Sequence, residues 1–102
     1  MSDLSDATFK AVLAESAFAL VDFWSPWCSP CKQMIPLVNR VKETVEGLEV
    51  YKVNTDECPQ IATFFRVQGV PTMLLLKRGV VQSVKVGSMT FAALVKWIED
   101  HR

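Results

Sequence analysis

The sequence has few cysteines, a single histidine and no excess of either charge. Three cysteines among 102 residues are an odd number, whereas small secreted disulfide scaffolds carry more cysteines and usually an even number. The 11 basic and 11 acidic residues cancel, without a basic patch or an acidic tail. The composition therefore does not indicate a nucleic-acid or membrane partner.

Long hydrophobic runs are also missing. The longest strongly apolar stretches have the length of a core strand, far short of a membrane span. Residues 1–6 are polar and acidic, without the basic start and apolar segment of a secretory signal. The sequence therefore predicts a cytoplasmic protein.

The composition itself is that of an ordinary globular domain. Half of the residues are hydrophobic and 22% are charged. A chain of this length can bury a stable core without metals or disulfides. Because no repeat, low-complexity tract or linker divides the sequence, we expect a single domain spanning residues 1–102.

Helical and extended patterns alternate along the chain. Ser5–Asp6 is predicted to cap a first helix, and Arg78–Gly79 to form a tight hairpin turn. Strands are predicted at 19–24, 49–54, 72–77 and 80–86, and further helices after the cysteine pair, from Pro59 and from Thr90. This order indicates an α/β fold with a mixed sheet and helices on both faces.

The segment WSPWCSPCK, residues 24–32, places two cysteines three positions apart. Cys28 follows a buried strand and precedes a helix, where ligand and active sites of open α/β sheets occur. A helix N-terminus stabilises negative charge, so the Cys28 thiol should ionise easily. Cys31 lies one turn further along the helix, where it should be more buried and less nucleophilic. Pro30 between them stiffens the loop.

Three kinds of chemistry use a close cysteine pair. A structural zinc site takes four Cys or His ligands, and beyond this pair the chain offers only Cys58 and the penultimate His101, so no metal site is predicted. A purely structural disulfide would close a very small loop and add little stability. In a reducing compartment a redox-active pair is the preferred interpretation.

A series of segments resembles the thioredoxin family over nearly the whole chain. VDFW, WCSPCK, VNTDE, VQGVPT, LLLKRG and KVGS stand in thioredoxin order and spacing; the cysteine motif alone would be a weak signal, but the series is specific. The resemblance implies a thioredoxin fold with a mixed central sheet of four to five strands and helices on both faces. Because only about four residues precede the first helix, the N-terminal strand is expected to be short or missing.

The resemblance implies a thiol–disulfide oxidoreductase that reduces disulfides in substrate proteins. Cys28 would attack a substrate disulfide, and Cys31 would resolve the mixed disulfide, leaving a Cys28–Cys31 disulfide. No bound cofactor is implied beyond this redox-active pair. The electrons would come from a thioredoxin reductase, an NADPH flavoprotein, and a monomer is expected.

Two charged residues match charged positions of the family. Asp22 matches its buried carboxylate, and an aspartate inside an apolar strand is unusual on any interpretation. Burial without a partner raises a carboxyl pKa, so Asp22 is predicted to accept the proton of Cys31; the alternative is a local hydrogen bond. Lys52 matches a supporting lysine near that carboxylate, with an exposed strand lysine as the alternative.

The resemblance also implies a flat apolar rim where substrates bind. Val70–Pro71 matches the cis-proline of the family, and the Val70 backbone would pair with an extended substrate segment. Ser29 stands where the family commonly has glycine, so Ser29 and Pro30 are expected to tune the reduction potential. The residues matching the rim are Trp27, Pro30, Val70, Pro71 and Gly87.

Two other functions stay open from the sequence. A disulfide oxidase or isomerase would have a higher reduction potential, but such relatives usually carry a histidine between the cysteines, where this chain has Ser-Pro. A non-catalytic thioredoxin-fold module that binds partners would not need both cysteines.

Cys58 is an additional cysteine just before Pro59, where a helix start would make its thiol somewhat acidic. It is interpreted as an incidental loop residue, with a redox-sensitive or dimer-forming thiol as the alternative.

Overall fold

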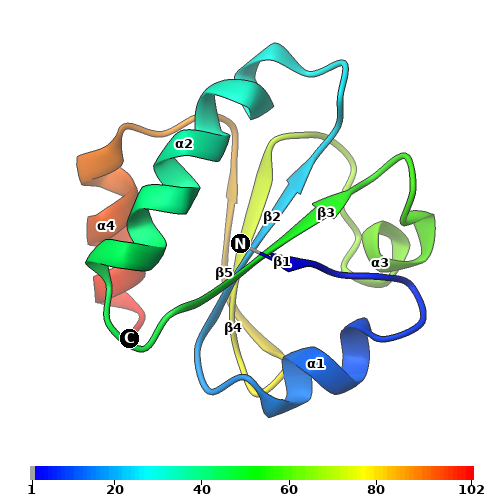
Figure 1. The fold of residues 1–102 in the computed structure, drawn as a ribbon, viewed down its shortest axis with the longest axis horizontal. Helices are drawn as coiled ribbons and strands as arrows, with labels where there is room; N and C mark the ends of the chain where they lie inside the picture. The colour runs from blue at the N-terminus through cyan, green and yellow to red at the C-terminus, as the bar shows by residue number, and fades with distance from the viewer. Residues whose placement is uncertain (1) are drawn as a thin grey trace.

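The computed structural model describes residues 2–102 of the chain (Figure 1). The strands β2 to β5 occupy the predicted ranges, because each is a short apolar or β-branched run bounded by turn residues. In chain order the elements are β1 (Ser2–Asp3), α1 (Phe9–Glu15), β2 (Ala19–Trp24), α2 (Ser29–Thr44), β3 (Glu49–Asn54), α3 (Pro59–Phe64), β4 (Thr72–Lys77), β5 (Val80–Val86) and α4 (Phe91–Asp100).

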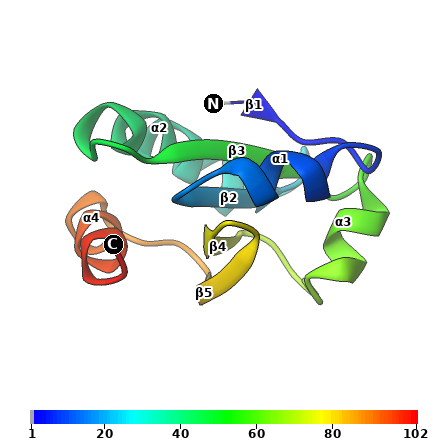
Figure 2. The ribbon, with the colours of Figure 1, turned by 90° about the horizontal axis from the view of Figure 1, so that it is seen from below.

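The strands form one sheet in the order β1-β3-β2-β4-β5. β1, β3 and β2 run parallel, whereas β4 pairs antiparallel with both β2 and β5. Figure 2 shows β1 and β5 at the two edges. The predicted mixed sheet is confirmed, and β1 is the expected short strand, since its two residues pair with Tyr51 and Lys52 of β3.

Helices cover both faces of the sheet, α2 and α4 on one side and α1 and α3 on the other (Figure 1). Because side chains alternate between the faces of a strand, β2 sends Leu20 into the core with α2 and α4. It sends Val21 and Phe23 into the core with α1 and α3. Burial on both faces explains the nearly continuous apolar sequence of β2, which Asp22 interrupts on the α2 side.

The turn between β4 and β5 is anchored to the end of α1. Arg78 and Gly79 have φ angles of 51° and 83°, as a two-residue hairpin turn with matching twist requires. The Arg78 N–H donates to the Ser16 carbonyl at 2.8 Å, and its guanidinium donates to the Glu15 carbonyl at 2.7 Å. The predicted hairpin is therefore present and fixed at its tip.

The helix caps are predicted correctly for α4 and wrongly for α1. Thr90 Oγ1 accepts a hydrogen bond from the Ala93 N–H at 3.1 Å and caps α4. α1 begins after Thr8, which makes no side-chain cap bond. The prediction that Ser5–Asp6 caps α1 is therefore wrong.

Asp6 instead caps α3, whose first turn lies beside it in the folded chain. Its carboxylate accepts hydrogen bonds from the N–H groups of Ile61 at 2.9 Å and Gln60 at 3.4 Å. The first N–H groups of a helix have no partner within the helix and lie at the positive end of its dipole, so a carboxylate is well suited to bind them.

Removing this cap with Asp6→Ala is expected to destabilise the protein by about 1 kcal/mol, because two N–H groups of α3 lose their acceptor. Urea unfolding at neutral pH measures the change. Ser5→Ala is the matched control, since the exposed Ser5 hydroxyl bonds to Thr8 and not to α3. Equal losses in the two variants would contradict the cap assignment.

Candidate active site

Cys28 is the N-cap residue of α2, directly after the connection from β2. Its N–H donates to the Ser25 carbonyl at 3.2 Å, and its Sγ accepts from the Cys31 N–H at 3.2 Å. The unpaired N–H groups and the positive dipole end of the helix stabilise negative charge here. A thiolate on Cys28 would therefore have a hydrogen-bond donor already in place.

Cys28 and Cys31 form a disulfide, with their Cα atoms 5.3 Å apart. Both side chains are buried, and Cys31 is completely so, which agrees with its predicted deeper position. Ser29 and Pro30 occupy the first two positions of α2 and are exposed. Proline is tolerated there because its missing N–H would have no partner within the helix.

Asp22 lies in β2 on the face that α2 covers. Its side chain is completely buried, and within the described part of the chain neither carboxylate oxygen has a hydrogen-bond partner. Burial raises the pKa of Asp22 from 3.8 to about 7, and the positive charge of Lys52 opposes this shift. Asp22 can therefore take up or release a proton near neutral pH, which an ordinary aspartate cannot.

Lys52 pairs in register with Asp22 across β3 and β2. Its Nζ lies 3.6 Å from an Asp3 carboxylate oxygen and 5.5 Å from the centre of the Trp24 ring. The side chain is 28% exposed, so Lys52 is partly buried, and its supporting role stays a prediction. Its positive charge therefore acts on the exposed Asp3 carboxylate and also on the buried Asp22 carboxyl.

Several residues predicted to form the substrate rim lie close to one another. Trp27 is 71% exposed, and its Nε1–H donates to an Asp56 carboxylate oxygen at 3.4 Å. Trp27 and Val70 line the same hollow of about 120 Å³. The Val70–Pro71 bond is cis, as the resemblance implied, and the Pro71 carbonyl accepts from the Gly87 N–H at 2.9 Å.

Two buried polar groups near the disulfide are not among the predicted site residues. Ser25 Oγ and Trp24 Nε1 have no hydrogen-bond partner among residues 2–102, although buried polar groups nearly always have one. Ser25 belongs to the turn whose carbonyl holds the Cys28 N–H. The sequence offered one signal for Ser25, its position directly after the apolar strand. If the buried run continues by one residue, the Ser25 hydroxyl is buried as well.

Cys58 is buried and lies outside this site. Its thiol donates to the Leu4 carbonyl at 3.5 Å. Burial raises the pKa of the Cys58 thiol, and the negative charges of Asp6 and Glu57 raise it further. The expectation of an acidic thiol at this helix start is therefore wrong, and the interpretation as an incidental residue agrees with its apolar surroundings.

In the reduced protein, Cys58 is expected to react with iodoacetamide much more slowly than Cys28 at neutral pH, because the thiolate is the reacting form. Burial raises the pKa of the Cys58 thiol, whereas Cys28 caps α2, where negative charge is stabilised. Timed alkylation followed by peptide mass spectrometry measures both rates. The difference should largely disappear in concentrated urea. Equal labelling of the two thiols in the folded protein would show that Cys58 is accessible and acidic after all.

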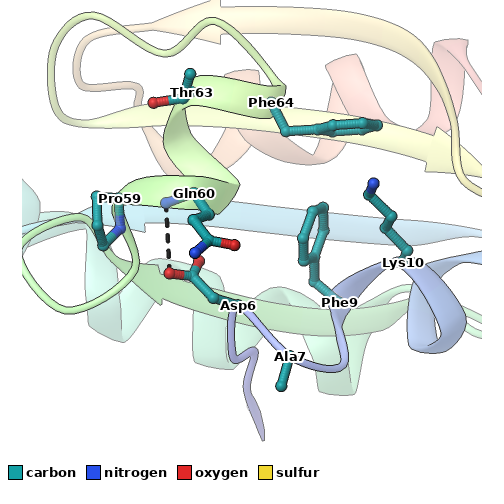
Figure 3. Close-up of a pocket in the computed structure, with 8 residues that line it drawn as sticks. All are labelled: Asp6, Ala7, Phe9, Lys10, Pro59, Gln60, Thr63 and Phe64. Atoms are coloured by element: carbon teal, nitrogen blue, oxygen red, sulfur yellow. Dashed lines mark hydrogen bonds between the residues drawn. The ribbon is translucent and has the colours of Figure 1, made fainter.

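A larger hollow of about 560 Å³ lies between α1 and α3. Figure 3 shows the rings of Phe9 and Phe64 beside Lys10, and Asp6 bonded to the Gln60 backbone across the hollow from them. The Lys10 Nζ lies 4.8 Å from the centre of the Phe64 ring. None of the predicted site residues lines this hollow, so its size does not mark the active site.

Neither a metal centre nor a membrane span is found in the described part of the chain. Among residues 2–102, no group of three or more His, Cys, Asp or Glu side chains is placed to hold a metal ion. Over the same residues, no helix combines the length and the apolar character that crossing a membrane requires.

Comparison with known proteins places this sequence and fold in a family. The family model described as thioredoxin matches residues 1–100. The chain belongs to the thioredoxin family. It is 38% identical to thioredoxin 1 of Nostoc sp., over 98% of this chain and 95% of that protein.

Two further thioredoxins show how widely the likeness extends. The chain is 36% identical to the chloroplastic M-type thioredoxin of Spinacia oleracea, over 99% of this chain and 57% of that protein. A solved mutant thioredoxin from Halobacterium salinarum superposes with a TM-score of 0.90 at 29% identity, over 98% of this chain and 88% of that one. The predicted thioredoxin fold and thiol–disulfide oxidoreductase activity are confirmed.

Proposed function

We propose that this thioredoxin-family chain reduces disulfides in substrate proteins, with Cys28 as the nucleophile and Cys31 as the resolving thiol. The observation that carries the proposal is the Cys28–Cys31 disulfide with Cys28 as the cap of α2. Thiol–disulfide exchange depends on thiolate fraction and on access. The helix N-terminus supports the first, and the neighbouring exposed Trp27 surface supports the second.

The reaction has two exchange steps. The reduced Cys28 thiolate attacks one sulfur of a substrate disulfide, which forms a Cys28–substrate disulfide and releases the other substrate sulfur as a thiolate. Cys31 then loses its proton and attacks Cys28 Sγ, which forms the Cys28–Cys31 bond and releases the second substrate thiolate. The substrate gains two electrons, and the protein loses them.

Asp22 is proposed to accept the Cys31 proton in the second step, with Lys52 in support. Leu20 and Asp22 share one face of β2, and Leu20 packs with Met34 of α2. Cys31 lies three residues before Met34, on the same side of that helix. A carboxyl with a pKa of about 7 is matched to proton transfer at neutral pH.

The rim is proposed to hold the substrate on either side of the attacked disulfide. The exposed ring of Trp27 and the surface of Val70 offer apolar contacts. The backbone of Val70, before Pro71, is proposed to pair with an extended substrate segment, with Gly87 beside it. We assign Ser29 and Pro30, at the first positions of α2, to tuning the reduction potential.

The finer assignments of partner and location belong to the same proposal. Members of the thioredoxin family act on disulfide substrates and are generally reduced by thioredoxin reductase; we propose an NADPH flavoprotein of that kind as the electron source here. A cytoplasmic monomer of one domain, residues 1–102, is proposed as the working form. No prosthetic group is needed, because the electrons reside in the Cys28–Cys31 pair.

The direct test is the reduction of insulin by dithiothreitol with and without the protein. Catalytic amounts of protein are expected to shorten the delay before the reduced insulin chains precipitate, because Cys28 exchanges faster than dithiothreitol with the insulin disulfides. If the protein leaves the delay unchanged, it is not a protein-disulfide reductase. A measured reduction potential at or above that of glutathione would instead favour an oxidase or isomerase.

A further inference from the structure

β5 forms an edge of the sheet, and one of its faces is apolar and open. Val84 lies opposite Leu74, which packs in the core with α1 and α3, and Val86 shares this face two residues further on. Val84 is 51% exposed and Val86 is exposed as well. The opposite face of β5 is held by α4, where Trp97 donates to Ser83 at 2.8 Å.

The backbone of the same two valines points away from the sheet. The Gly87 N–H donates to the Pro71 carbonyl, which makes this a hydrogen-bonded position of the β4–β5 ladder. In an antiparallel pair such positions alternate with positions whose N–H and C=O groups point outward. Val86 and Val84 therefore present their backbone groups to the open side, where a further strand can pair.

A hollow of about 250 Å³ runs beside these valines, between β5 and the chain leading from α3 to β4. Phe65, Leu74 and Val84 contribute apolar surface to it. Val67 and Gly69 line this hollow and also the smaller hollow under Trp27. The hollow that Trp27 lines therefore adjoins the hollow at the edge of β5.

The charges, which cancel over the whole chain, are divided unevenly along it. Between Glu57 and Glu99 the sequence has five basic residues and no aspartate or glutamate. Arg66 lines the hollow and Lys85 lies in β5. Within the described part of the chain, neither of these two has an acidic partner. This edge therefore complements a segment that carries negative charge.

We infer that the edge of β5 is a docking strip for an extended, apolar and acidic segment of the substrate protein. The segment pairs its backbone with Val84 and Val86 and places apolar side chains in the adjoining hollow. It sets one acidic side chain near Arg66 and, because side chains alternate along a strand, another near Lys85 on the opposite face of β5. This rests on the proposed function and adds a preference among substrates. Pairing of β5 with a second copy is the less suitable arrangement, since it would bring basic residues together.

Two disulfide peptides test the inference. Both contain the same intramolecular disulfide and the same apolar extended flank, and they differ in having glutamate or lysine at the flanking polar positions. The reduced protein is expected to react about fivefold faster with the glutamate peptide. The glutamate side chains form ion pairs with the basic residues of the strip, whereas the lysine side chains are repelled by them. Arg66→Glu should remove most of this preference.

Val84→Ser should slow reaction with the glutamate peptide about tenfold, since an apolar contact at the centre of the strip is lost. Val80→Ser is the matched control: Val80 is 62% exposed on the same strand but does not line the hollow. Reaction with a small nitrophenyl disulfide should be equal in all these proteins. Equal effects of Val84→Ser and Val80→Ser, or no peptide preference, would overturn the inference.

Docking is also measured without any reaction. A cysteine-free glutamate peptide is added to the oxidised protein, and amide NMR signals are followed. Shifts centred on Val84 and Val86 support the strip even if insulin reduction fails, so the two proposals are tested separately. Shifts confined to the Trp27 surface, or a dimer in sedimentation that Val84→Ser abolishes, would overturn it.

Discussion

Replacing Cys28 with serine is expected to reduce the insulin reaction to the rate of dithiothreitol alone. A serine hydroxyl does not ionise near neutral pH and cannot form the mixed disulfide, so the helix N-terminus has no nucleophile to stabilise. The insulin precipitation assay measures the loss. A Cys28→Ser protein that still catalyses the reaction would show that another thiol attacks the substrate.

The other two cysteines provide matched controls. Cys58→Ser should keep the full rate, because this buried thiol lies outside the site. Cys31→Ser should also lose turnover, but for a different reason: Cys28 still attacks, and the mixed disulfide is not resolved. Mass spectrometry should therefore find one substrate chain attached to Cys31→Ser and none to Cys28→Ser. The reverse pattern would exchange the two assigned roles.

Asp22→Asn is expected to make the oxidised protein more stable at high pH. An ionised Asp22 is buried without a hydrogen-bond partner among the described residues, whereas asparagine carries no charge to bury. The pKa rises from 3.8 to about 7 on folding, and a difference of about three pKa units corresponds to about 4 kcal/mol. Urea unfolding of both proteins from pH 4 to pH 9 measures the difference.

The sign of this pH dependence follows from proton binding. At pH values between the pKa of Asp22 in the unfolded chain and its pKa in the folded protein, Asp22 is protonated in the native state and ionised in the unfolded state. The native state therefore loses stability as the pH rises through this range. The advantage of Asp22→Asn should therefore be smallest near pH 4, grow up to about pH 7 and stay constant above. A pH-independent difference for Asp22→Asn would exclude a raised Asp22 pKa.

The strands and the active-site turn could be predicted from the sequence because their causes are local. A short apolar run such as Ala19–Trp24 forms a buried strand, and a two-residue turn with glycine closes a hairpin. The position of Cys28 also needs nothing more than a strand before it and a helix after it. The thioredoxin resemblance then added the cis bond before Pro71, which the structure contains; the proton-accepting role that it implies for Asp22 stays a prediction.

The wrong predictions depend on contacts between distant parts of the chain. Asp6 was assigned to the helix that follows it, but folding places its carboxylate at α3, which begins more than 50 residues later. Burial, together with the negative charge of the same carboxylate, raises the pKa of the Cys58 thiol. The position of Cys58 at a helix start had suggested the opposite, an acidic thiol. Local sequence gives the intrinsic preference of a group, and the neighbours that folding brings decide the outcome.

The sheet divides the hydrophobic core into two layers, and substitutions in the two layers can have different effects. The disulfide and Asp22 belong to the layer of α2 and α4, whereas α1 and α3 pack a separate group of side chains on the other side of the sheet. Substitutions that share no contacts tend to act independently. Away from Val70, which packs against the α1–α3 layer and also belongs to the substrate rim, that layer can therefore be rebuilt to raise or lower thermal stability, while the redox chemistry on the opposite side is left as it is.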